Sequence, residues 1–178
     1  PRGVFSLKGA GGQALPGAYK NPDVAGLSIR QDWAELQPTD SPLIFDYLDC
    51  EVKKATDNGQ IAFLRINTQQ NKPGWVTQAV VDAGGTFFSF DDDGTRTIPV
   101  FWDPTYLAKK KAMIAALGAH FTGNSTVKIV SVSFANAESE DWSVPHEVPD
   151  IPNWHTAGYT PEKLVDAGQQ LIDANMIA

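Results

Sequence analysis

The chain has 178 residues, 42% of them hydrophobic, and a formal net charge of −7. This length fits a single domain with a sizeable core, and the acidic balance argues against nucleic acid as a partner, because phosphate binding needs a basic surface. No run of about 18 apolar residues occurs and no polybasic segment is present, so the sequence predicts neither a membrane-spanning helix nor binding to a membrane surface. The only cysteine, Cys50, excludes an intrachain disulfide and is expected to be a partly buried thiol.

The subcellular compartment is not determined by the sequence. The first residues do not have the long apolar stretch of a signal peptide, and a mature exported chain would look the same once its signal had been removed. An extracellular or periplasmic location is therefore the expectation that we favour.

Four apolar runs are predicted to be β-strands. The first and third are nearly continuous in apolar residues, which is typical of parallel strands that are buried on both faces. In chain order the four predicted strands are residues 3–7, 26–33, 61–67 and 127–136.

Three segments have the start signals and the periodicity of helices. Residues 41–59 begin with Ser-Pro and end with Asn-Gly, residues 103–121 begin with Asp103 followed by proline, and residues 160–177 begin with Thr-Pro. In the second segment one apolar stripe is interrupted by Lys110. The stripe consists of Tyr106, Met113, Leu117 and Phe121.

Between the third strand and the second of these helices lies an insertion, residues 86–102, which is predicted to be a β-hairpin. The tripeptide Asp-Asp-Gly supplies its turn. The aspartates there do not follow the twelve-residue pattern of a calcium loop, and no histidine spacing fits zinc, so we expect no metal and no cofactor.

Strands that alternate with helices predict a parallel sheet joined by right-handed crossovers. The glycine-rich residues 9–12 fit neither the dinucleotide-binding nor the P-loop spacing, which disfavours a nucleotide-binding fold. The expected fold class is therefore α/β, of the (β/α) barrel type, with about four βα units: a half or truncated TIM barrel. Residues 1–178 would form a single domain that is incomplete relative to an eight-unit barrel.

Polar and aromatic side chains follow the predicted strands, where (β/α) barrels carry their chemistry. Flat aromatic rings can stack on sugars, while amides and charged groups bind hydroxyls, so this pattern predicts a carbohydrate site. The candidate binding residues are Arg30, Trp33, Arg65, Asn67, Trp75, Trp102 and Asn136, and the candidate acids are Glu138 and Glu140.

Residues 24–142 resemble the retaining glycoside hydrolases of clan A, particularly the β-galactosidase-like TIM barrels. The resemblance rests on "GLSIRQDWAELQPTDSPLIFDYLDCEVKKATDNGQIAFLRI", on "NKPGWV", and on "FWDPTYLAKKKAMIAALGAHFTGNSTVKIVSVSFANAE". It implies the first half of such a barrel, with Glu138 as the general acid/base and Arg30 as a residue that orients the site. The family has Asn immediately before this Glu, whereas here Ala137 separates Asn136 from Glu138, and Glu140 is the alternative acid.

Retaining hydrolysis needs two carboxyl groups about 5 Å apart, and the family's nucleophile has no counterpart in this chain. Three hypotheses therefore remain: a glycoside hydrolase or part of one, a non-catalytic carbohydrate-binding protein, and a half-barrel that pairs with a second copy of itself. Simpler interpretations also stand, with Glu138 as a solvated loop acid, Arg30 in an ion pair with Asp32 or Glu51, and the tryptophans in the core.

Overall fold

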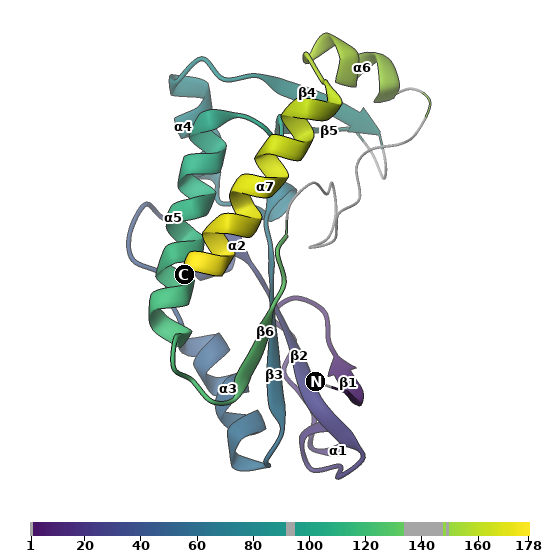
Figure 1. The fold of residues 1–178 in the computed structure, drawn as a ribbon, viewed down its shortest axis with the longest axis vertical. Coiled ribbons are helices and arrows are strands. Elements are labelled where there is room, and N and C mark those ends of the chain that lie inside the picture. Colours follow the sequence, from purple (N-terminus) through teal and green to yellow (C-terminus); the bar gives the residue numbers. More distant parts are fainter. Residues whose placement is uncertain (1, 92–94, 134–147, 149) are drawn as a thin grey trace.

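The computed structural model describes residues 2–91, 95–133, 148 and 150–178, and it has an α/β architecture (Figure 1). Four strands form a sheet in the order β1-β2-β3-β6, and every neighbouring pair is parallel. This confirms the expected parallel sheet; the described strands form an open sheet and not a closed barrel. The strands are β1 (Val4–Leu7), β2 (Val24–Asp32), β3 (Ile61–Asn67) and β6 (Val127–Val130).

The three predicted helices are present. They are α3 (Asp46–Asp57), α5 (Pro104–Phe121) and α7 (Pro161–Ile177). The Asp103 carboxylate accepts a hydrogen bond of 2.8 Å from the backbone of Tyr106, so it caps α5 as expected. Thr160 caps α7 in the same way, whereas α3 begins five residues after Ser41.

The predicted hairpin is also present, as antiparallel strands β4 (Phe87–Asp91) and β5 (Thr95–Pro99). Several short elements escaped the sequence analysis because they have too few turns for a periodic pattern to emerge. They are α1 (Pro16–Tyr19), α2 (Trp33–Leu36), the 3₁₀ turn η1 (Gln69–Asn71), α4 (Gly74–Asp82) and α6 (Asp150–Thr156).

Helices cover one face of the sheet. In Figure 1 the long helices α3, α5 and α7 lie to one side of the strands. Ile29 of β2 and Leu64 of β3 are buried in the core on that side. Phe63 alternates with core residues along β3 and therefore points to the other face, and the strand register aligns Leu7 and Ile129 with it.

On α5, Lys110 does not interrupt the apolar stripe but lies buried within it, with only 1% of its surface exposed. The Lys110 amine lies 5.6 Å from the centre of the Tyr106 ring. Tyr106, Met113, Leu117 and Phe121 are all buried, as the stripe predicts.

The hairpin and α6 are held together by stacked aromatic rings. Trp154 of α6 stacks on Phe88 at 4.7 Å and on Trp102 at 5.5 Å between ring centres. Strand β5 also lies against η1, which follows the end of β3. The hairpin unit is therefore anchored at the carboxyl end of the parallel sheet.

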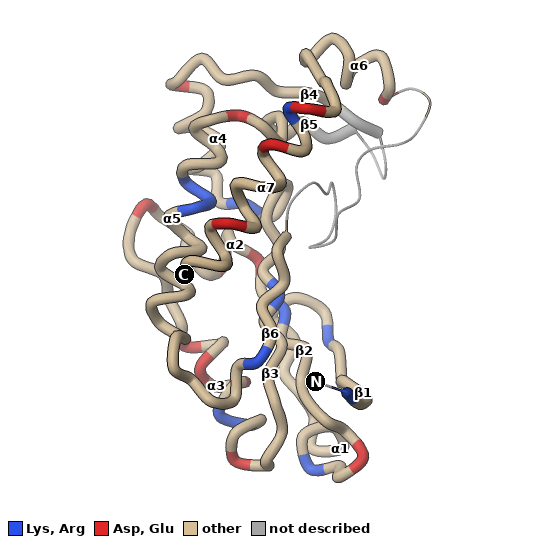
Figure 2. Tube along the Cα trace, in the orientation of Figure 1, with Lys and Arg blue, Asp and Glu red and all other residues tan. Residues whose placement is uncertain are grey.

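The two signs of charge are interspersed along the described trace (Figure 2). None of the described helices is both long enough and apolar enough to span a bilayer.

Candidate functional site

The register of β2 and β3 places two pairs of polar residues side by side at the carboxyl ends of these strands. Arg30 is paired with Arg65, and Asp32 is paired with Asn67 two residues later. Residues two apart on a strand point to the same face, so all four side chains lie on the face opposite the helix-packed core. The strand-end grouping expected for Arg30, Arg65 and Asn67 is thus present.

A carboxylate held by two amides forms the centre of this group. One oxygen of Asp32 accepts hydrogen bonds from the side-chain amides of Asn67, at 2.6 Å, and Asn71, at 2.8 Å. Asn71 comes from the 3₁₀ turn that follows β3, so the turn and the strand both orient the carboxylate. Neither Arg30 nor Arg65 is fully buried, and the Arg65 guanidinium lies 5.5 Å from the centre of the Phe63 ring.

Three buried amide atoms of Asn67 and of the following 3₁₀ turn have no hydrogen-bond partner in the part of the chain that the structure describes. They are the side-chain oxygen of Asn67 and both polar side-chain atoms of Gln69. An unsatisfied buried polar atom costs about 1–3 kcal/mol, so such atoms are rare in folded proteins.

The backbone at Gln69 is also strained. Its φ is 35°, the only positive value among the non-glycine residues that the structure describes. Its N–H donates to the Tyr106 hydroxyl at 3.2 Å, which holds the turn in place. Strain of this kind gathers at functional sites, because the surrounding fold must compensate for it.

The candidate tryptophans separate into two places. Trp33 is fully buried at the start of α2, where its ring lies edge-on to that of Trp75, 6.3 Å away. Its face is therefore occupied by packing and offers no exposed platform. Trp75 is partly exposed, with its N–H bound to the Gln37 carbonyl and the Lys109 amine 5.1 Å from its ring centre.

Trp75 lines a hollow of about 330 Å³ together with Asp40 and Lys109. Trp102 is partly exposed and belongs to the aromatic stack of the hairpin and α6, where the Lys163 amine lies 5.8 Å from its ring centre. The described contacts of both rings are with residues other than Asp32. Asn136, Glu138 and Glu140 lie outside the described residues.

Two buried lysines, Lys72 and Lys110, have lowered pKa values. Burial lowers the pKa of Lys72, which follows η1, to about 8, and that of Lys110 to about 7. Burial also raises the pKa of the Tyr106 hydroxyl. Sequence analysis did not single out Asn71 or Lys72; the polar run after β3 in "NTQQNK" was their only signal.

No group of three or more His, Cys, Asp or Glu residues that could hold a metal ion occurs in the part of the chain that the structure describes. Cys50, expected to be partly buried, is exposed on α3.

Comparison with known proteins yields a partial likeness to a solved structure. No family model matches the sequence, and no curated protein matches it. Among solved structures, the chain is similar to a beta-galactosidase from the psychrophilic Marinomonas ef1, with a TM-score of 0.49 and 14% sequence identity. The alignment covers 61% of this chain and 17% of that chain. This chain therefore matches only a small part of that protein.

Proposed function

We propose that this protein binds carbohydrate at the carboxyl ends of its parallel strands and that it is related in chemistry to the glycoside hydrolases. The observation that carries the proposal is the group formed by Asp32, Asn67 and Asn71 with the Arg30–Arg65 pair beside it. A sugar presents several hydroxyls, each both donor and acceptor, and this group offers a fixed acceptor, amides and guanidinium donors.

The unpartnered amide atoms of Asn67 and Gln69 support a polar ligand over an apolar one. A hydroxyl that reached them would satisfy atoms whose burial otherwise costs free energy. The position of the group at the strand ends is where (β/α) proteins carry their ligands.

For catalysis we propose Glu138 as the general acid/base, with Glu140 as the alternative. The support is the order and spacing of the motifs that resemble the clan A hydrolases, and the position of both acids shortly beyond the fourth strand. A non-catalytic carbohydrate-binding protein is the second candidate. This candidate is favoured by the two hydrogen bonds that the Asp32 carboxylate accepts from the side-chain amides of Asn67 and Asn71.

The first experiment measures release of 4-nitrophenol from a panel of aryl glycosides, including the β-galactoside. Loss of a general acid/base lowers the rate about 10²- to 10⁴-fold, so Glu138→Gln should show such a loss. Glu162→Gln is the matched control, because Glu162 is an exposed acid on α7 and should keep full activity. If Glu138→Gln keeps full activity and Glu140→Gln loses it, the alternative acid is the correct one.

The second experiment measures sugar binding by calorimetry with the same panel. We expect Asn67→Ala to weaken binding about tenfold, which is the loss of one good hydrogen bond. Asn58→Ala, at the exposed end of α3, should leave binding unchanged. Binding without turnover would establish the non-catalytic alternative, and absence of both would refute the carbohydrate proposal.

A further inference from the structure

Lys110 carries the one buried amine without a hydrogen-bond partner among the residues that the structure describes. Burial lowers the pKa of Lys110 to about 7, so at neutral pH about half of the folded molecules carry its positive charge. A buried charge is strongly destabilising unless an opposite charge or hydrogen bonds compensate for it. The Lys110 amine is therefore a place where a ligand of opposite charge would be bound.

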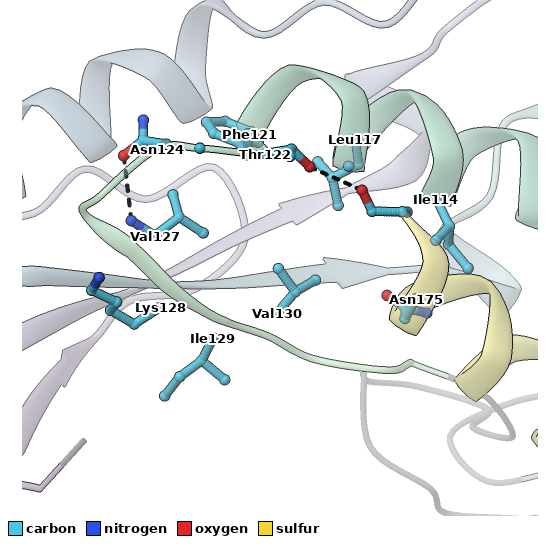
Figure 3. Close-up of a pocket in the computed structure, with 13 residues that line it drawn as sticks. Ile114, Leu117, Phe121, Thr122, Asn124, Val127, Lys128, Ile129, Val130 and Asn175 are labelled. Atoms are coloured by element: carbon cyan, nitrogen blue, oxygen red, sulfur yellow. Dashed lines mark hydrogen bonds between the residues drawn. The ribbon is translucent and has the colours of Figure 1, made fainter.

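A small cavity of about 10 Å³ lies next to this lysine, on the helix side of the sheet. This volume is enough for one species of about the size of a water molecule. Figure 3 shows the neighbouring, larger hollow, with which the cavity shares Val130 of β6 and Asn175 of α7. The polar walls of the cavity are Lys110, Thr68, Ser131, Ser133 and Asn175.

The polar groups around the cavity include several hydrogen-bond donors. An ammonium group has three donors and no acceptor, and each hydroxyl adds one donor. The hydroxyls of Thr68 and Ser133, both buried, lie 3.1 Å apart. One of them donates to the other, and the second keeps its proton for a group inside the cavity.

The described walls of the cavity contain no Asp or Glu that could neutralise the amine. Thr68 comes from the end of β3, Ser131 and Ser133 follow β6, and Asn175 comes from α7, so each element that faces Lys110 contributes an uncharged group. In agreement with this, burial is the cause that lowers the pKa of Lys110, and no charge of the described residues opposes it.

We propose that this cavity binds one monatomic anion, of the size of chloride, with the ammonium group of Lys110 as its counter-ion. The ammonium neutralises the anion, and a hydroxyl of the Thr68–Ser133 pair donates a further hydrogen bond to it. A polyatomic anion such as sulfate exceeds a space for one water-sized species. A water molecule has the right size, but it would leave the charge of the ammonium uncompensated.

Binding of the anion is linked to protonation of Lys110. Below pH 7 the folded protein already carries the ammonium, so the anion binds without uptake of a proton. At pH 9, two units above the pKa of about 7, only about 1% of the amine is protonated. The apparent affinity for chloride should therefore be roughly 90-fold lower at pH 9 than at pH 6. The site does not depend on the proposed carbohydrate site, which lies on the other face of the sheet.

The first test compares thermal unfolding of the full chain in sodium chloride and in sodium gluconate at the same ionic strength. Chloride should raise the Tm at pH 6 and raise it much less at pH 9. Lys110→Met should abolish the difference between the two salts, whereas Lys53→Met, a change at a side chain that is 73% exposed, should retain it. An equal chloride effect in Lys110→Met, or no chloride effect at pH 6 in the unchanged protein, would overturn the proposal.

The second test examines the hydroxyl donors. In a chloride titration of the Tm at pH 6, Ser133→Ala should weaken the apparent affinity about tenfold, which corresponds to the loss of one good hydrogen bond. Ser41→Ala, in an exposed loop, is the matched control and should leave the affinity unchanged. If neither Ser133→Ala nor Thr68→Val weakens chloride binding, the hydroxyls are not ligands and the proposed site is wrong.

The third test locates the anion directly. Crystals of the full chain, grown at pH 6 and soaked in sodium bromide, should show an anomalous scattering peak in the cavity beside the Lys110 amine. Crystals of Lys110→Met should not show this peak. Electron density in the cavity without an anomalous signal would assign the site to water, and this result would overturn the proposal.

Discussion

The two faces of the parallel sheet differ in what covers them and therefore in what they contribute. On one face Ile29 and Leu64 are buried under α3, α5 and α7. On the other, Leu7 is half exposed and Phe63 is partly exposed, and Arg30 and Arg65 lie two residues before the strand ends. The covered face supplies most of the stability, whereas the open face carries the polar groups that can bind a ligand.

The largest effect on the covered face is expected at Lys110, whose buried amine has no hydrogen-bond partner among the described residues. The pKa of Lys110 falls from 10.5 in an exposed lysine to about 7. Between pH 7 and 10.5 the unfolded chain then binds more protons than the folded chain, so stability rises with pH across this window. Below pH 7 the amine is charged in both states and the full penalty applies.

Lys110→Met should accordingly raise the free energy of unfolding at pH 7 by about 4 kcal/mol and reduce the rise between pH 7 and 10.5, leaving above pH 8 the smaller contribution of Lys72. Urea unfolding at several pH values measures both effects. Lys53→Met is the matched control, because that side chain is 73% exposed and should keep the slope. An unchanged slope in Lys110→Met would show that Lys110 is not the group responsible.

A direct comparison of the two faces uses neighbouring residues of β3. Leu64→Ala should cost about 3 kcal/mol, because it leaves a cavity in the covered core, whereas Phe63→Ala should cost about 1 kcal/mol from its partly exposed position. Denaturation at low protein concentration measures the difference.

On the open face the amide-held carboxylate should have a smaller structural role. Asp32→Ala removes the acceptor of the Asn67 and Asn71 amides, and we expect a loss of about 2 kcal/mol in unfolding free energy. Sugar binding, measured in parallel, should weaken more than stability does. Asp23→Ala, in an exposed loop, is the control that should change neither.

The smallest effects should come from the caps of the covering helices. Asp103 is buried and bonds at 2.8 Å, whereas the Thr160 cap bonds at 3.3 Å and is more exposed. Asp103→Ala should cost about 1.5 kcal/mol and Thr160→Ala about 0.5 kcal/mol in thermal or urea unfolding. Equal costs would mean that α7 contributes as much as α5 to holding the covered face.

The sequence by itself determined the strands, the long helices, the caps of α5 and α7, and the hairpin. These features rest on local chemistry: apolar periodicity, the hydrogen bond from a cap such as Asp103, and the backbone preferences of glycine and proline. It also predicted that Arg30, Arg65 and Asn67 would gather, because parallel strands align their carboxyl ends. The extent of β6 was overestimated: the described strand ends at Val130, before the predicted end at residue 136.

Only the tertiary structure decided which polar and aromatic side chains are enclosed. The sequence predicted that Lys110 interrupts an apolar stripe, but the side chain is buried. It also predicted that Trp33 is a sugar-binding residue at a strand end, but Trp33 lies in the core. Asn71 joined the carboxylate of Asp32 through a turn that no periodic pattern marks. Burial and pairing of this kind depend on segments that are distant in the chain, and a sequence pattern reports only on neighbours a few residues apart.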